Sequence, residues 1–172
     1  MSQPDPKTAA ALSADLSAFL DAAQIRTDPE TCLHYGRDWT RLYPPNPLAV
    51  ALPSTLDQVQ RLVRYANTHQ LALVPSGGRT GLSGAAVACR GEIVVSLERM
   101  HRILAFDPVD RSVTCQAGAV TEAIQHFARK QGLCYPVDFA SRGSSQIGGN
   151  IATNAGGIKV VRYGLTRDWV TG

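Results

Sequence analysis

The residues of this chain best suited to chemistry lie in one glycine-rich loop that directly follows a short apolar run. The loop reads Pro75-Ser76-Gly77-Gly78-Arg79-Thr80-Gly81-Leu82-Ser83-Gly84. Glycine lets consecutive backbone N–H groups turn toward one anion, while the hydroxyl groups and the arginine add donors and a positive charge. This composition predicts a phosphate-binding loop, and we expect a diphosphate as its ligand.

A second glycine cluster lies far downstream. It reads Gly148-Gly149-Asn150-Ile151-Ala152-Thr153-Asn154-Ala155-Gly156-Gly157. Either cluster alone could be an ordinary turn, because glycine is common in loops. Two such clusters in one short chain favour a ligand-binding interpretation of both.

The pattern after the first loop separates this chain from the common nucleotide-binding folds. Rossmann and Walker-type sites need a helix that begins at the phosphate. Here the next strong pattern is the β run Ile93–Leu97, and the intervening Ala85–Cys89 is too short for a helix. The loop contains neither a Gly-Lys-Ser/Thr ending nor the G-x-G-x-x-G spacing. The sequence therefore predicts that backbone N–H groups between two strands hold the anion.

The elements that must position the first loop form a β-α-β unit. Strands are predicted at 49–52 and 71–74, and Ser54 is the expected N-cap of the helix between them. An amphipathic helix over residues 6–23, capped by Asp5 with Pro6 in its first turn, is expected to precede this unit.

A second unit follows the strand at 93–97. Runs at 103–106 and 112–116 predict a hairpin, Thr121 opens a helix with Gly132 as its C-cap, and a short helix begins near Ser144. The predicted fold class is α+β with two successive α+β subdomains, the second incomplete. We expect a helical leader at 1–37 and subdomains at 38–101 and 102–172.

Composition and charge exclude several other classes. The chain has 172 residues, a formal net charge of +3 and 44% hydrophobic residues, which is typical of a globular protein with scattered charge rather than of a nucleic-acid-binding protein. No secretory signal or membrane-spanning run is found, so a cytoplasmic location is expected. The four cysteines and four histidines show no metal-ligand spacing. We expect no metal site, and reduced, mostly buried thiols.

Four segments in order resemble one family. They are Val74 to Gly84, Tyr135-Pro136-Val137-Asp138, Gln146 to Gly157, and Arg162-Tyr163-Gly164. Together they resemble the FAD-linked oxidases of the vanillyl-alcohol-oxidase (PCMH-type) fold, in the branch of D-lactate, glycolate and D-2-hydroxyglutarate dehydrogenases. The resemblance runs from about Asp38 to the last residue.

The resemblance implies FAD as cofactor, with residues 75–84 around its pyrophosphate. It also implies a second set of residues along the ribityl chain and isoalloxazine ring. This set is Pro136, Asp138, Ser141, Gly148, Gly149, Asn150, Thr153, Asn154 and Gly156. For Asn150 and Asn154 the structural alternative is helix or turn capping.

Two departures from the family pattern matter. Some relatives have a flavin-bonding histidine just after the paired glycines, where this chain has Arg79, so noncovalent FAD is implied. Asp138 lies in a Tyr-Pro-Val-Asp context where many relatives have Pro-Asp-Pro. The family's substrate domain and catalytic groups are expected beyond residue 172, and so no catalytic residue is assigned.

The function implied is FAD-dependent oxidation of a D-2-hydroxy acid to the 2-oxo acid by hydride transfer to flavin N5, with a separate electron acceptor. By itself, the 172-residue chain is expected to be inactive and to hold FAD poorly. Two alternatives stay open: a noncatalytic flavin-binding module and a nucleotide-binding protein unrelated to redox chemistry. A homo-oligomer is also left open.

Overall fold

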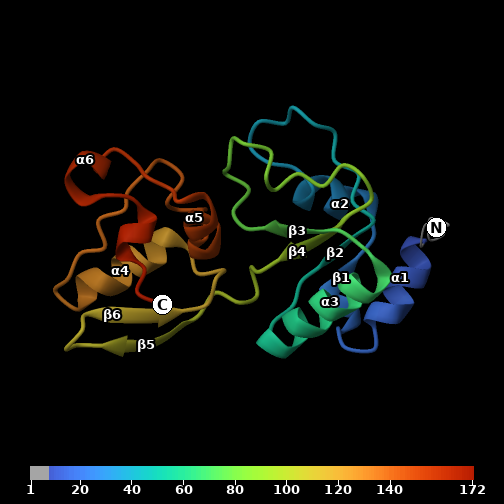
Figure 1. Cartoon of the computed structure of the whole chain (residues 1–172), viewed down its shortest axis with the longest axis horizontal. Coiled ribbons are helices and arrows are strands. Elements are labelled where there is room, and N and C mark those ends of the chain that lie inside the picture. Colours follow the sequence, from blue (N-terminus) through green and yellow to red (C-terminus); the bar gives the residue numbers. More distant parts are fainter. Residues whose placement is uncertain (1–7) are drawn as a thin grey trace. The chain divides into compact units, whose positions relative to one another are not determined.

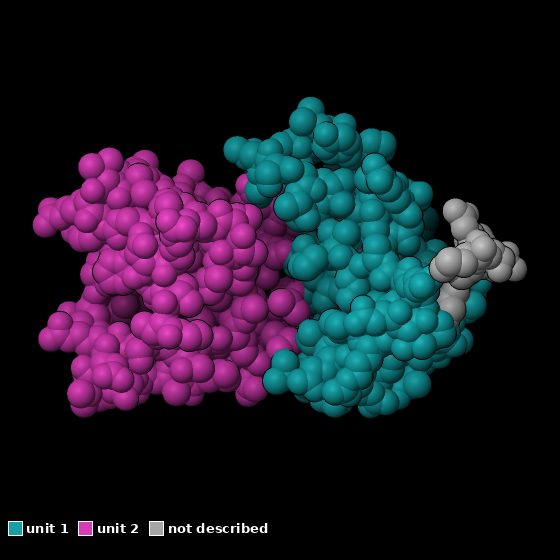
Figure 2. Space-filling view, in the orientation of Figure 1, with its two compact units in different colours: residues 1–76, 81–96 teal, residues 77–80, 97–172 magenta. Residues whose placement is uncertain are grey.

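The computed structural model describes residues 8–172, which form two compact units (Figures 1 and 2). Unit 1 comprises the described residues up to Ser76 together with Gly81–Ser96, and unit 2 comprises Gly77–Thr80 and Leu97–Gly172. The sequence predicts a boundary at 101/102 and a separate leader at 1–37. In the structure the described part of that leader belongs to unit 1, and the first glycine loop is shared between the two units.

The centre of unit 1 is a four-stranded sheet in the order β1-β2-β4-β3 (Figure 1). Its strands are β1 (Ile25–Arg26), β2 (Ala49–Ala51), β3 (Leu73–Ser76) and β4 (Ile93–Ser96). β4 runs parallel to both β2 and β3, whereas β1 is antiparallel to β2. All residues of β2 and β4 are buried, as expected for parallel strands covered on both faces. The three predicted strands 49–52, 71–74 and 93–97 are therefore confirmed, with ends shifted by one or two residues.

The helices of unit 1 depart from the predictions at their ends. They are α1 (Ala9–Leu16), η1 (Ala22–Gln24), α2 (Pro29–Tyr35) and α3 (Leu56–His69). The single helix expected over 6–23 is wrong, because α1 ends at Leu16 and the chain turns before η1. Thr8 is the N-cap of α1, while the expected cap Asp5 and Pro6 lie outside the described residues. The N-cap of α3 is Thr55, not Ser54, because the Thr55 side chain accepts from the Gln58 N–H.

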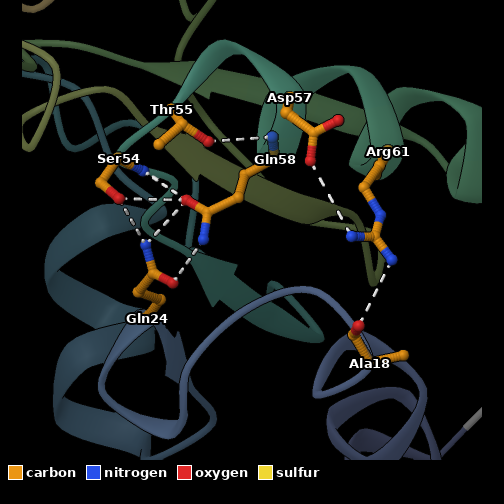
Figure 3. Close-up of polar contacts among 7 residues, drawn as sticks. All are labelled: Ala18, Gln24, Ser54, Thr55, Asp57, Gln58 and Arg61. Carbon is orange, nitrogen blue, oxygen red and sulfur yellow. Dashed lines mark hydrogen bonds and ion pairs between the residues drawn. The ribbon is translucent and has the colours of Figure 1, made fainter.

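A pair of glutamines joins η1 to the start of α3 (Figure 3). Gln24 Nε2 donates to Gln58 Oε1 at 3.0 Å, and Gln58 Nε2 donates to Gln24 Oε1 at 2.9 Å. Ser54 N–H also donates to Gln58 Oε1, and Gln24 Nε2 donates to the Leu52 carbonyl. Gln24 is almost fully buried, so these bonds compensate the cost of removing its amide from water. These bonds thereby fix η1 to the first turn of α3.

Unit 2 begins with the predicted hairpin, β5 (Ile103–Asp107) and β6 (Ser112–Cys115), which pair antiparallel. The helices that follow are α4 (Thr121–Lys130), α5 (Ile147–Thr153), α6 (Val160–Tyr163) and η2 (Thr166–Trp169). Ala119, Ile124 and Ile147 form the core, with Tyr135 packed against it. Helix α4 begins at Thr121 as expected. Its C-cap is Gln131, and Gly132 follows in the left-handed region at φ +71°.

The cysteines are less buried than expected. Cys32 is buried, Cys89 and Cys115 are half-buried, and Cys134 is exposed, which corrects the expectation of mostly buried thiols. Among residues 8–172, no group of three His, Cys, Asp or Glu side chains is placed to share a metal ion. A search of the same residues finds no helix both long and apolar enough to cross a membrane.

Candidate functional site

The first glycine loop connects two neighbouring parallel strands. β3 ends at Ser76 and β4 begins at Ile93, and no helix is found in the segment between them. Crossovers between parallel strands usually contain a helix, so this connection is unusual. The prediction that no helix follows the loop is confirmed.

In unit 1 the loop is bonded to the segment that follows α2. The Gly84 N–H donates to Asp38 Oδ2 at 2.9 Å, and the Trp39 N–H donates to the Gly81 carbonyl at 3.3 Å. Gly84 has φ +77°, a conformation that other residues adopt only with strain. Gly81 has open space where a Cβ would lie, and Leu82 and Ser83 are exposed. At the start of the loop, Pro75 is exposed, and the buried Ser76 hydroxyl donates to the Tyr35 carbonyl.

In unit 2, residues 77–80 lie against the segment that leads into α5. A Cβ on Gly78 would overlap the Ser144 carbonyl, and one on Gly77 would lie 3.4 Å from Gln146 Oε1. Arg79 has φ +56°, and its Nη1 donates to the Gly77 carbonyl at 3.1 Å. The structure therefore brings this part of the first glycine loop next to the start of the second cluster, which is far away in the sequence.

The two paired glycines of α5 have different surroundings. A Cβ on Gly148 would lie 2.8 Å from the Ala117 side chain, and the Gly148 N–H donates to the Ala117 carbonyl. Gly149 is exposed, and a Cβ at this position would have nothing within 4 Å. Gly148 thus permits close packing inside unit 2, whereas Gly149 leaves a bare backbone surface that a flat ring could approach.

The two asparagines of the second cluster are engaged within the protein. Asn150 is buried and its Nδ2 donates to Thr121 Oγ1 at 2.6 Å, and that hydroxyl also contacts Ser145. Asn154 is the left-handed C-cap of α5, and its Oδ1 accepts from the Arg167 N–H at 3.0 Å. Asn154 thus caps a helix, as the structural alternative predicts, whereas Asn150 lies inside α5 and makes a buried bond to another helix instead of a cap.

Asp138 is the centre of an ion-pair network in unit 2. Its carboxylate accepts from Arg142 Nη1 at 2.8 Å and from Lys159 Nζ at 2.9 Å, and Arg142 also contacts Glu122. The hydrogen bonds from Lys159 and Arg142 lower the pKa of Asp138. This carboxylate ties the chain before α5 to the chain after it, a role that the sequence-based assignment to the flavin does not foresee.

The remaining predicted site residues of unit 2 surround α5. Pro136 is buried, and the Ser141 carbonyl accepts from the N–H groups of Ser144 and Ser145. Thr153 is exposed, with its hydroxyl donating to the Gly149 carbonyl. A Cβ on Gly156 would lie 2.7 Å from the end of the Leu165 side chain.

Sequence reasoning does not anticipate an open hollow on unit 2. It is lined by Ile158, Lys159, Val161, Arg162 and Tyr163. Val161 is fully exposed, and the Arg162 guanidinium lies 5.2 Å from the centre of the Tyr163 ring. The Arg-Tyr-Gly segment thus contributes to this hollow, but among the predicted cofactor residues none lines it.

The residues of each unit suit anion binding better than acid-base chemistry. In unit 1 the Gly81 backbone is uncovered, and in unit 2 the Gly149 backbone is uncovered and Arg79 brings a cation to the loop. The two least exposed aspartates here, Asp38 and Asp138, are both occupied by donors. Asp38 is a residue that the sequence does not reveal, because nothing in its spacing relates it to Gly84.

The chain is similar to known proteins over most of its length. The family described as FAD binding domain matches residues 47–172. A D-2-hydroxyglutarate dehydrogenase from Xanthomonas citri pv. viticola is 60% identical over 157 residues, which are 91% of this chain and 33% of that protein. One from Stutzerimonas stutzeri is 56% identical over 162 residues, 94% of this chain and 35% of that protein. The chain spans about a third of the length of these curated relatives.

Solved structures show the same fold at low identity. An alkyldihydroxyacetonephosphate synthase matches 95% of this chain and 35% of its own, with a TM-score of 0.83 and 24% identity. A p-cresol methylhydroxylase matches 84% of this chain and 29% of its own, with a TM-score of 0.69 and 19% identity. The likeness confirms the expected α+β fold of the PCMH type.

Proposed function

The chain belongs to the FAD binding domain family, and on this basis we propose that it binds FAD noncovalently as the cofactor-holding part of a dehydrogenase. The substrate is a D-2-hydroxy acid, with D-2-hydroxyglutarate the first candidate because relatives 60% and 56% identical carry that name. The flavin, when bound, supplies the acceptor for the hydride that leaves the α-carbon. Loss of the hydroxyl proton completes the conversion to the 2-oxo acid.

One observation carries the proposal: Gly77 and Gly78 lie against Ser144–Gln146, directly before α5. A pyrophosphate loop and a segment along the ring of the same cofactor would need to lie near one another, and this proximity supports the assignment. Of the predicted residues 75–84, Pro75 and Ser76 belong to β3, and the Ser76 hydroxyl is bonded to the Tyr35 carbonyl. Residues 77–84 would hold the pyrophosphate through backbone N–H groups, with the hydroxyls of Thr80 and Ser83 as further donors. The uncovered backbone at Gly149 would lie along the flavin.

The residues present fit the proposed cofactor. Where a Cβ would project from Gly81 or Gly149 there is open space, so the backbone is accessible to a ligand. Arg79 can offset phosphate charge while its bond to the Gly77 carbonyl keeps it on the loop. Arg79 also stands where a histidine would be needed for a covalent flavin bond, which supports noncovalent binding.

The test is spectroscopic. We expect the purified chain, with FAD added in excess, to acquire the yellow absorbance of bound oxidised flavin. In a chimera in which this chain replaces the corresponding residues of the 60% identical relative, D-2-hydroxyglutarate or D-lactate should bleach this absorbance under anaerobic conditions. Bleaching by the L-enantiomers alone would contradict the proposed substrate class, and a colourless protein that takes up no added FAD would contradict cofactor binding.

The electron acceptor, the oligomeric state and the cytoplasmic location stay predictions. Each can be examined once flavin binding is established, beginning with reoxidation of the reduced protein by dyes and by oxygen.

A further inference from the structure

Asp38 has an unusually complete set of hydrogen-bond donors. Its side chain is buried, with the residue only 3% exposed. Oδ1 accepts from the Thr40 N–H at 3.0 Å and from Thr40 Oγ1 at 2.7 Å, while Oδ2 accepts from the Gly84 N–H at 2.9 Å. Burial by itself raises the pKa of Asp38, but the bonds from Thr40 and Gly84 outweigh it and the pKa is lowered. Asp38 is therefore a charged acceptor at neutral pH.

The segment around Asp38 is bonded to the glycine loop and to the chain just after it. The Trp39 N–H donates to the Gly81 carbonyl, and the Ala88 N–H donates to the Gly36 carbonyl at 2.9 Å. The Tyr43 ring lies 3.6 Å from where a Cβ on Gly84 would be. Residues 81–84 have no helix or strand of their own. Their conformation thus depends on bonds from residues 36–43, and Asp38 provides the one that is charge-assisted.

We propose that Asp38 is a positioning residue for the cofactor, which fixes the backbone at Gly84 and so holds residues 81–84 ready for the pyrophosphate of FAD. This inference rests on the proposed function. A loop that is ordered before binding loses less conformational entropy when the ligand arrives, so a clamp that never touches the ligand still raises its affinity. Carboxylate serves better than a neutral acceptor because charge-assisted bonds are the stronger ones.

Asp38→Asn tests the inference with little change in shape. The single oxygen of the amide can still accept from Thr40, but the NH₂ group then faces the Gly84 N–H, which is also a donor. The matched control is Asp28→Asn in the same unit: Asp28 is the N-cap of α2, a position where asparagine is equally suitable. Both variants remove one negative charge.

The purified protein is titrated with FAD, with ADP and with riboflavin. ADP contains the pyrophosphate without the flavin, and riboflavin contains the flavin without the pyrophosphate. We expect Asp38→Asn to weaken the affinity for both FAD and ADP by about tenfold or more, the size of effect typical of losing a bond to a charged group. Its affinity for riboflavin should stay near that of wild type, and Asp28→Asn should bind all three ligands with near wild-type affinity.

Two outcomes overturn the inference alone. In the first, Asp38→Asn binds FAD as tightly as wild type does. In the second, the affinities of the variant for FAD and for riboflavin fall by the same factor, as a general loss of structure would predict. A wild type that binds no FAD instead removes the proposed function, and this inference with it. If Asp38→Asn does not fold, Asp38→Glu takes its place. This variant keeps the charge, but its extra methylene displaces the carboxylate from the Gly84 N–H, so FAD and ADP should again bind more weakly while riboflavin binding stays near wild type.

Discussion

Gly78 lies so close to the backbone of Ser144 that a Cβ atom there would overlap the Ser144 carbonyl and come within 2.9 Å of the Ser145 Cα. Both partners are backbone, so neither can rotate away. Absence of a side chain at Gly78 is thus a packing requirement of unit 2, whatever the loop binds. Loss of FAD in a Gly78 variant would therefore not by itself locate the pyrophosphate.

Alanine at Gly78 and at Gly81 should separate packing from binding. We expect Gly78→Ala to destabilise unit 2 by about 1–3 kcal/mol, as overpacking against a rigid neighbour typically does. Gly81 faces open space, so Gly81→Ala should leave the unfolding midpoint in urea near wild type. If the loop holds the pyrophosphate, Gly81→Ala should nevertheless weaken FAD binding in a titration. If Gly81→Ala binds FAD with wild-type affinity, the pyrophosphate does not contact Gly81.

The sequence predicts this strand-loop-strand arrangement well because its signals are local. Ile93–Ser96 and Leu73–Ser76 are short apolar runs on either side of the loop, and the space between them has no helical periodicity. The helix over 6–23 is wrong for the opposite reason. Apolar spacing continues beyond Leu16, yet α1 ends there, and the bonds of Gln24 to Gln58 and Leu52, which are distant in sequence, hold the next segment as the separate helix η1.

Tertiary contacts also decide which polar residues can serve a ligand. Asp38 is bonded to Gly84, and Asn154 to the Arg167 N–H. Neither pairing follows from spacing along the chain, so the sequence does not reveal Asp38 and assigns Asn154 to the cofactor by motif alone. Gly148 and Gly149 are adjacent and identical in type, but only the fold shows that Gly148 faces Ala117 and Gly149 faces open space.

Arg79 provides a test of charge in the loop. We expect Arg79→Ala to weaken FAD binding, because it removes a cation near the proposed pyrophosphate and the bond to the Gly77 carbonyl. The part due to charge should shrink as salt rises from about 10 mM to 500 mM, since screening weakens interactions between exposed charges. Titrations at both ionic strengths measure this. If the loss of FAD affinity does not change with salt, Arg79 supports the loop conformation through its bond to the Gly77 carbonyl and its charge does not act on the pyrophosphate.

The ion pairs of Asp138 predict an acid dependence. Its folded-state pKa is lowered from 3.8 by Lys159 and Arg142, so its stabilisation of unit 2 is complete above the unfolded-state value and is lost as pH falls through the folded-state value. Asp138→Asn should therefore destabilise the protein at pH 7 and reduce the loss of stability between about pH 5 and 2. Urea unfolding across this range measures the effect. Asp110→Asn, at an exposed turn, is the control, and equal profiles for both variants would contradict the prediction.

Tyr135 predicts a dependence at the alkaline end. Burial raises its pKa to about 12, and its ring meets the Trp169 ring edge-on at 6.4 Å between centres. Because the folded-state pKa is the higher one, the stabilisation is complete below the unfolded value of about 10 and is lost as pH rises toward 12. Tyr135→Phe should lose less stability than wild type between about pH 10 and 12, as followed by thermal melting. An identical alkaline decline in both proteins would show that Tyr135 is not the group responsible.

A graft into a longer relative tests whether these residues can serve as the flavin-binding third of a dehydrogenase. The aligned 157 residues of the 60% identical bacterial D-2-hydroxyglutarate dehydrogenase are replaced by the corresponding residues of this chain. We expect the chimera to bind FAD in a 1:1 ratio and to oxidise D-2-hydroxyglutarate within about tenfold of the parent rate, since 60% of the grafted residues are unchanged. The chimera carrying Asp38→Asn should need more added FAD for full activity but should reach a similar maximal rate. The chimera carrying Asp28→Asn should need no more FAD than the unmutated chimera. A chimera that folds and binds FAD but gives no turnover with either enantiomer would show that this chain holds the cofactor without supporting the proposed chemistry.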